Sequence, residues 1–255
     1  MSGRDRLIYL PLGGAGEIGM NAYVYGYGKP GKERLILVDI GIAFPDMAST
    51  PGVDIILADI SWLSERLDRL EAVFITHGHE DHVGGIGHLY PQLQKPVHAR
   101  KFTANLARRK LQEKGQDPSV VETAAPYPAM IEAGPFKVGF LPVSHSIPES
   151  NALVIDTPGG RIIHTGDFNV ARLQSLAVAG EAAGRSICLM GRAMRRMTEA
   201  AREEGILTDF PKTISPEDAA NVPRESLMLI VTGSQGERRP ASAQLSRGKY
   251  FGMEL

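Results

Sequence analysis

Three histidines and an aspartate fall at positions 77, 79, 81 and 82, directly after the apolar run 72–75. His77 and His79 alternate on an extended segment, so both side chains would point to one side of it. Asp81 and His82 enter the next turn and could face a second ion. Imidazoles and carboxylates gathered in so small a volume are typical of metal sites. The alternative is a polar loop whose imidazoles bond to backbone carbonyls, which would suit a single histidine better than this set.

Two further segments could complete a metal site. His145 leaves an apolar strand in a turn rich in serine and proline, and Asp167 follows the strand 161–164 in a Thr-Gly-Asp-Phe sequence. We expect His145 to join the first ion and Asp167 to bridge two ions. Asp39 closes the apolar strand 35–38 and has two interpretations that the sequence leaves open. It either orients a metal ligand through a hydrogen bond or caps a turn or helix.

Short strands and amphipathic helices must position these residues, and the spacing of apolar residues predicts where they lie. The predicted strands cover residues 7–12, 22–27, 35–38, 72–75, 152–155, 161–164, 186–190 and 227–231, and the predicted helices cover residues 61–70, 103–114, 173–183 and 192–204. Every candidate ligand follows a strand-like run. Loops at one edge of a sheet can bring such groups together, so we expect one metal-binding edge, built from the loops after residues 75, 141 and 166.

The glycine-rich stretch 13–19 contains the letters of a dinucleotide-binding fingerprint, with Asp39 about 20 residues later. That fingerprint needs a helix to begin in the glycines, because the helix N-terminus holds the pyrophosphate. Here the alternating, aromatic segment 22–27 follows instead and predicts a second strand. We therefore interpret the glycines as a hairpin turn.

The composition indicates a globular chain without a bulk cationic surface. The 255 residues are 43% hydrophobic, enough for one large core or two modest ones, and 28 Lys+Arg against 29 Asp+Glu give a net charge of −1. Any site for a polyanion must therefore be local. The single cysteine, Cys188, lies in an apolar run, which excludes an intramolecular disulfide and suits a reducing cytosol. No apolar run approaches the roughly 18 residues of a membrane span, so we expect a cytoplasmic protein without membrane association.

Five segments carry a resemblance to a known family: residues 12–21, 78–85, 145–148, 165–168 and 231–237. Together they resemble bacterial ribonuclease J, one of the β-CASP nucleases of the metallo-β-lactamase superfamily. The resemblance implies an α/β fold, with a metallo-β-lactamase αββα sandwich and a partial β-CASP α/β domain that would clamp single-stranded RNA. We expect the first domain over residues 1–168, the partial β-CASP domain over residues 169–237 and an unaligned tail over residues 238–255.

The resemblance also assigns roles to individual residues. It implies one zinc ion held by His77, His79, His145 and Asp167, and a second held by Asp81, His82 and the shared Asp167, with manganese as the alternative ion. Asp39 matches the first acidic motif of the family. Asp81, His82 and Asp39 are thus the candidate catalytic residues.

Candidate RNA contacts lie in the second part of the chain. Ser234 and Gln235 fall in a turn after a strand, where backbone amides could bind phosphate, although a tight turn is an equal interpretation. Arg195 and Arg196 lie on the basic side of the predicted helix 192–204. The predicted helix 103–114 also has a basic side. Such a side is more often exposed to solvent than used to bind phosphates. Single-stranded RNA is the expected partner, and a homo-oligomer is left open.

The sequence also departs from the family. After Phe168 the family continues with a long stretch that includes an acidic β-CASP motif, whereas this sequence passes directly to residues that resemble a helix deep inside that domain. The family later supplies two further histidines, one a ligand of the second zinc and one near the scissile phosphate. All seven histidines here lie at or before His164. We therefore expect an internal deletion, a C-terminal truncation and an incomplete second zinc site.

Three functions remain open from the sequence. The first is a zinc-dependent ribonuclease of the J type, both endonuclease and 5′-to-3′ exonuclease, in RNA processing and decay. The second is a catalytically impaired fragment that binds metal, RNA or a partner without turnover. The third is a hydrolase of small esters, such as a thioesterase or lactonase, because one fold hosts several activities.

Overall fold

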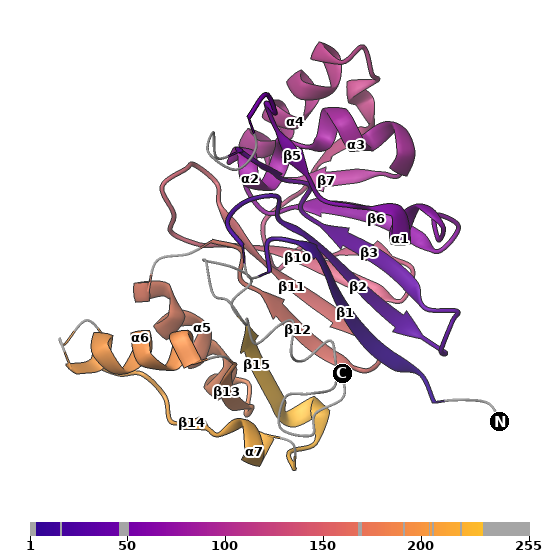
Figure 1. Cartoon of the computed structure of the whole chain (residues 1–255). Coiled ribbons are helices and arrows are strands. Elements are labelled where there is room, and N and C mark those ends of the chain that lie inside the picture. The colour runs from indigo at the N-terminus through magenta and orange to yellow at the C-terminus, as the bar shows by residue number, and fades with distance from the viewer. Residues whose placement is uncertain are drawn as a thin grey trace.

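The protein is described by a computed structural model over residues 4–15, 17–45, 51–167, 170–190, 192–203, 205, 207–219 and 221–231. Two β-sheets face each other and carry helices on their outer sides (Figure 1). The first sheet contains, in spatial order, β1 (Arg6–Gly13), β2 (Ala22–Gly28), β3 (Arg34–Val38), β6 (Leu70–Ile75), β7 (Val97–Ala99) and β8 (Val121–Thr123). The second contains β14 (Thr213–Ile214), β13 (Ser186–Met190), β15 (Leu227–Val231), β12 (Gly160–His164), β11 (Asn151–Thr157), β10 (Phe136–Pro142) and β9 (Ile131–Ala133). A separate small pair joins β4 (Ile42–Ala43) to β5 (Ile56–Leu57).

The helices are α1 (Ser61–Ser64), α2 (Glu80–Val83), α3 (Ile86–Leu93), α4 (Lys101–Glu113), α5 (Val170–Ala182), α6 (Arg192–Glu203) and α7 (Pro216–Ala219), with 3₁₀ turns at Pro118–Val120 and Arg224–Ser226. Helices α1 to α4 pack on the outer face of the first sheet, where Leu63, Ile86 and Leu111 join one apolar cluster with the strands. Helix α5 packs on the outer face of the second sheet through Leu176 and Ala177.

The main core lies between the two sheets. Tyr23 and Phe74 from the first sheet meet Phe136, Phe140 and Leu153 from the second. Side chains alternate between the two faces of each strand, so Leu153 faces this core while its neighbour Val154 faces α5. Three apolar layers between four layers of secondary structure form the predicted αββα sandwich, and the α/β fold class is confirmed.

The glycine-rich stretch is a hairpin turn, as predicted. β1 and β2 pair in antiparallel register from Arg6↔Gly28 to Gly13↔Ala22. Gly14 has a φ of +78°, and a Cβ there would lie 2.4 Å from the Oδ1 atom of Asn21. No helix begins in the described residues of this turn, so the arrangement that a dinucleotide fingerprint requires is not formed.

The prediction of a helix over residues 61–70 is wrong beyond residue 64. Helix α1 ends at Ser64, and successive turns follow, closed by hydrogen bonds from Arg66 N to Leu63 O and from Arg69 N to Arg66 O. Leu70 already pairs with Leu35 in the first sheet. Apolar residues at helical spacing predicted the helix. Because β6 already begins at Leu70, the helix cannot continue to that residue.

The second sheet continues across residue 168. β12 pairs in parallel with β15 through Ile163↔Ile230, and β15 pairs in parallel with β13. Strands from both predicted domains thus form one hydrogen-bonded sheet, and the division at residue 168 stays a prediction.

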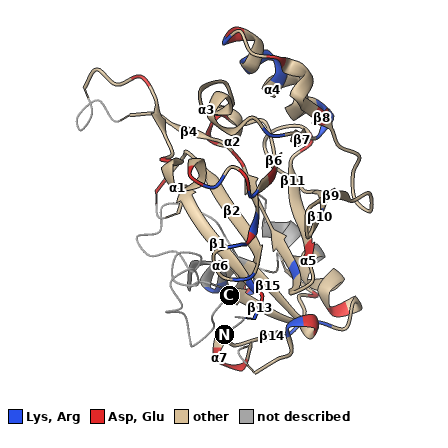
Figure 2. Cartoon of the chain, turned by 90° about the vertical axis from the view of Figure 1, so that its right-hand side faces the viewer, with Lys and Arg blue, Asp and Glu red and all other residues tan. Residues whose placement is uncertain are grey.

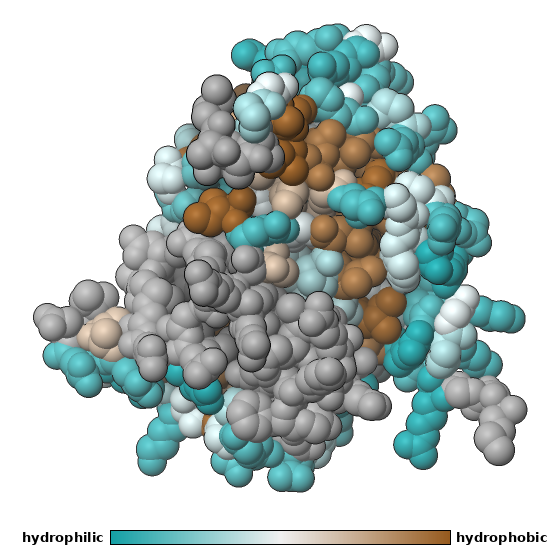
Figure 3. Space-filling view, viewed as in Figure 1, coloured by the Kyte–Doolittle hydropathy of each residue, from teal (hydrophilic) through white to brown (hydrophobic). Residues whose placement is uncertain are grey.

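The surface carries both charge signs. Figure 2 shows basic and acidic residues spread over the ribbon, whereas α4 is mainly basic and carries one acidic residue at its end. Figure 3 shows apolar residues gathered over the first sheet on the face toward the viewer. Within the described ranges, no helix has both the length and the apolar character to cross a membrane.

Candidate metal centre

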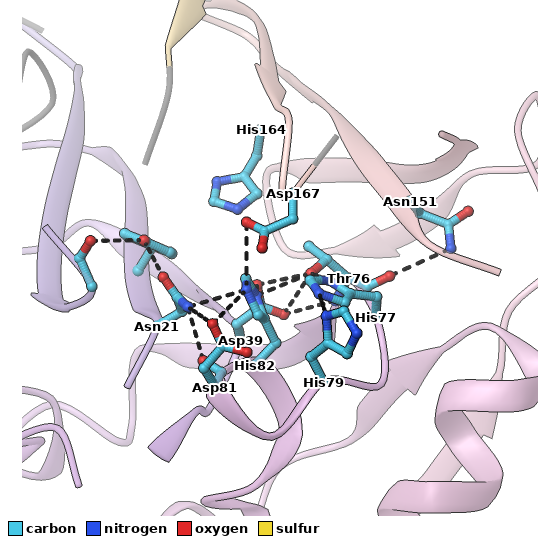
Figure 4. Close-up of polar contacts among 12 residues, drawn as sticks. Asn21, Asp39, Thr76, His77, His79, Asp81, His82, Asn151, His164 and Asp167 are labelled. Atoms are coloured by element: carbon cyan, nitrogen blue, oxygen red, sulfur yellow. Dashed lines mark hydrogen bonds and ion pairs between the residues drawn. The ribbon is translucent and has the colours of Figure 1, made fainter. Parts of the chain in front are cut away.

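Six candidate ligands meet at one edge of the sandwich, where strands of both sheets end. β6 ends at Ile75 just before His77 and His79, and α2 presents Asp81 and His82. His145 follows β10, and Asp167 follows β12. Figure 4 shows the side chains of His77, His79, His82 and Asp167 turned toward one another. The loops after residues 75, 141 and 166 thus converge at this edge, as predicted.

The first group comprises His77, His79, His145 and Asp167, whose candidate ligand atoms all lie within 4.8 Å of one another. The Nδ1 atom of His79 lies 3.1 Å from the Nε2 atoms of both His77 and His145. Asp167 Oδ2 lies 3.7 Å from His145 Nε2. Three ring nitrogens and one carboxylate oxygen therefore face a common point.

The second group comprises Asp81, His82 and Asp167, again with candidate atoms within 4.8 Å. The Nε2 atom of His82 lies 3.6 Å from both Asp81 Oδ2 and Asp167 Oδ1. Asp167 belongs to both groups because its two carboxylate oxygens point to different histidines. Among the described residues, the second group offers three donors where the first offers four.

The spacing of the first group fits a tetrahedral ion. Nitrogen ligands at about 2.0–2.1 Å from a tetrahedral zinc ion are about 3.3 Å apart. The two nitrogen–nitrogen distances of 3.1 Å between His79 and its neighbours are close to this separation. Imidazole and carboxylate donors suit zinc or manganese. The residues present thus fit a divalent metal ion.

Asp39 lies beneath the second group, fully buried, and its contacts differ from those of a helix cap. His82 Nδ1 donates to Asp39 Oδ2 at 2.7 Å, and the backbone N–H of Thr76 donates to Asp39 Oδ1 at 2.7 Å. The Thr76 hydroxyl lies within hydrogen-bond distance of both Asp39 oxygens and 3.0 Å from His77 Nδ1. Because Nδ1 of His82 faces Asp39, its Nε2 faces Asp81 and Asp167.

Asn21 is a residue of this site that sequence reasoning missed. It is buried, and its Nδ2 donates to the backbone oxygen of Asp81 at 2.9 Å and to Asp81 Oδ2 at 3.2 Å. Tyr23 donates from its hydroxyl to Asn21 Oδ1 at 2.7 Å, which fixes the orientation of the amide. The signal in the sequence was the polar residue that ends the glycine-rich stretch, but nothing local pointed to a partner 60 residues away.

Burial and neighbouring charges set the protonation of the centre. Burial, with a smaller effect from His82, lowers the pKa of His77 to about 3. Burial alone would lower the pKa of His82, but Asp39 and Asp167 outweigh it and raise the pKa to about 10. Burial would raise the pKa of Asp167, but its hydrogen bond to His82 and the surrounding histidines lower it to about 2. Without a metal ion, His77 is thus neutral at pH 7 and His82 is protonated, so His82 would release a proton on binding an ion.

His164 lies beside the centre but in neither group. It is buried at the end of β12, with its Nδ1 2.9 Å from the Tyr25 hydroxyl. Burial lowers the pKa of His164 to about 4, so its ring is neutral at pH 7.

The structure describes only some of the candidate RNA-binding residues. Arg195 lies on α6 and is partly exposed. The side chain of Arg196 and all of Ser234 and Gln235 lie outside the described residues. Two basic residues of α4 are engaged within the protein, since Lys110 pairs with Glu80 at 2.7 Å and Arg108 donates to Val121 O.

Comparison with protein families gives two matches. A family described as "Metallo-beta-lactamase superfamily" matches residues 15–187, and a family described as "Ribonuclease J, beta-CASP domain" matches residues 159–255. Among solved structures, the metallo-β-lactamase fold protein YhfI from Bacillus subtilis shares 20% identity at a TM-score of 0.46, covering 72% of this chain and 71% of that chain.

The chain is also similar to curated proteins named "Ribonuclease J". The protein from Sinorhizobium meliloti is 34% identical, covering 97% of this chain and 56% of the relative, and that from Corynebacterium glutamicum is 31% identical, covering 94% and 42%. The chain thus spans about half the length of these relatives. The first alignment runs over 316 residues although this chain has 255, so it includes segments of the relative without a counterpart here.

Proposed function

We propose that this chain, which belongs to the ribonuclease J family of the metallo-β-lactamase superfamily, is a metal-dependent phosphodiesterase that cleaves single-stranded RNA. The observation that carries the proposal is the convergence of four histidines and two aspartates on two adjoining points that share Asp167. By family, the activity is that of an endonuclease and 5′-to-3′ exonuclease.

In this proposal His77, His79, His145 and Asp167 hold one ion, and Asp81, His82 and Asp167 hold a second. Zinc is the first choice and manganese the alternative, because both accept imidazole and carboxylate ligands. When bound, such ions supply Lewis acidity toward a phosphoryl oxygen and activate water at neutral pH.

The surrounding residues hold these side chains in place. Asp39 accepts a hydrogen bond from His82 Nδ1 and so directs Nε2 toward Asp81 and Asp167. Carboxylates in this position fix the tautomer and the ring orientation of a ligating histidine. Asn21 holds the Asp81 carboxylate from the other side. Because the side chains of His82 and Asp81 are already oriented, the site needs less rearrangement during the reaction.

One observation keeps a second function in view, that of a catalytically impaired chain that binds metal or RNA without turnover. The second group has only three donors among the described residues. Hydrolysis of a small ester has no such support, and faster cleavage of a thioester or lactone than of RNA would favour it.

The experiment follows cleavage of labelled, 5′-monophosphorylated single-stranded RNA with added zinc or manganese. We expect cleavage that stops with a chelator and returns with metal, and that is lost in His79→Ala and Asp81→Ala. His88→Ala is the matched control, since His88 is exposed and outside both groups. Equal cleavage by wild type and both site variants would refute the metal mechanism. Metal binding without any cleavage would favour the second function.

A further inference from the structure

The segment that carries His145 is a loop between two neighbouring strands. It runs from Val143 to Ser150, between β10 and β11, and the Val143 N–H closes its base by donating to Ser150 O at 2.9 Å. No strand or helix holds His145 itself, although its Nε2 must lie within 3.1 Å of His79 Nδ1. Something outside the loop must therefore set its position.

Glu149 connects this loop to the beginning of α4. Its Oε2 accepts a hydrogen bond from the backbone N–H of Phe102 at 2.6 Å, and its Oε1 pairs with Arg100 at 3.2 Å. Phe102 lies in the first turn of α4, where backbone N–H groups have no partner within the helix and a negative charge is favoured. Helix α4 has no cap from its own N-cap side chain, so Glu149 supplies this role from another part of the chain.

The backbone of Glu149 adopts an uncommon conformation. Its φ is +53°, in the left-handed region that residues other than glycine rarely adopt. Such a conformation persists when the surroundings determine it. The carbonyl oxygen of Glu149 also accepts a hydrogen bond from Asn151 Nδ2, and the Asn151 N–H donates to Thr76 O, next to His77.

Apolar contacts bring the same two elements together over Gly78. A Cβ at Gly78 would lie 2.7 Å from Leu106 and 3.3 Å from Phe102, both on α4, and 3.4 Å from Ile147 in the loop. The loop and α4 therefore close over the glycine that separates His77 from His79. A shift of the loop away from α4 would move His145 relative to both histidines.

We propose that Glu149 is a positioning residue that ties the His145 loop, residues 143–150, to the start of α4 and so sets His145 against His79. The consequence for metal binding rests on the role of His145 in the proposed function. Glu149 contacts neither candidate group directly, and it acts through the loop.

The first test is hydrogen–deuterium exchange of the metal-free chain. In Glu149→Ala, we expect faster exchange in residues 143–150 and at the start of α4, with β9 unchanged. Glu149→Gln keeps an oxygen acceptor for Phe102 and should show a smaller increase. Glu132→Ala removes an exposed ion pair with Lys137 and is the matched control. Unchanged exchange of residues 143–150 in Glu149→Ala would overturn the proposal.

The second test is a double-mutant cycle with Co²⁺ as the probe, read from its visible absorption. Glu149→Ala should weaken Co²⁺ binding roughly ten- to a hundredfold, as loss of an outer support of a metal ligand does. The effect should vanish in a His145→Ala background, because Glu149 would act through that ligand. An equal loss in both backgrounds would overturn the proposal. If wild type binds no Co²⁺ yet the exchange result holds, the proposed metal function fails and the positioning role stands.

Discussion

Asp39 is a buried carboxylate whose negative charge is balanced inside the protein. His82 donates to it at 2.7 Å, and Thr76 donates from its backbone at the same distance. Burial would raise the pKa of Asp39, but His82 outweighs it, so the pKa is lowered and the carboxylate stays ionised. Its φ of +62° is tolerated by aspartate and asparagine better than by most residues. The sequence left this residue open between two roles because its partner lies 43 residues away.

Asp39→Asn removes the charge and keeps a side chain that tolerates this backbone conformation. We expect metal affinity to fall roughly ten- to a hundredfold, because His82 loses the carboxylate that orients its ring. Titration with Zn²⁺ in a competing chelator measures the change. Asp59→Asn, at an exposed turn, is the matched control. Unchanged affinity in Asp39→Asn would show that the contact does not support metal binding.

At the scale of elements, backbone hydrogen bonds join three segments around α2. Asn21 N donates to Asp81 O, and Ile40 N donates to His82 O. Gly41 N donates to Asn21 O, which closes the arrangement. Local patterns could predict the strands on either side, and β13 and β15 have the predicted bounds. Local patterns could not predict these hydrogen bonds between loops, because the spacing of apolar residues holds no information about them.

Gly41 is confined by this arrangement. A Cβ there would lie 1.6 Å from Asp81 O, a backbone atom that must move to make room. Gly41→Ala should therefore lower the free energy of unfolding by more than the roughly 1–2 kcal/mol of a left-handed alanine. Gly115→Ala is the control, since Gly115 has a φ of +68° and no atom within 4 Å. Urea unfolding compares the two, and equal losses would mean that the segments are not tightly joined.

At the scale of the whole molecule, the sequence predicted the fold class more readily than the pairing of distant strands. The order of ligand-bearing loops predicted one edge, and the αββα sandwich agrees with it. The pairing of β12 with β15 could not be predicted, since it joins strands more than 60 residues apart, with α5, β13, α6, β14 and α7 between them. Long-range parallel pairing depends on the whole fold rather than on local pattern.

The most direct test is anomalous diffraction from crystals of the chain grown with Zn²⁺ or Mn²⁺. We predict one strong peak enclosed by His77, His79, His145 and Asp167, because this group has four donors. A weaker peak is expected beside Asp81 and His82, where the described residues supply three. A map with no peak in the first group, or with its strongest peak elsewhere, would contradict the metal centre.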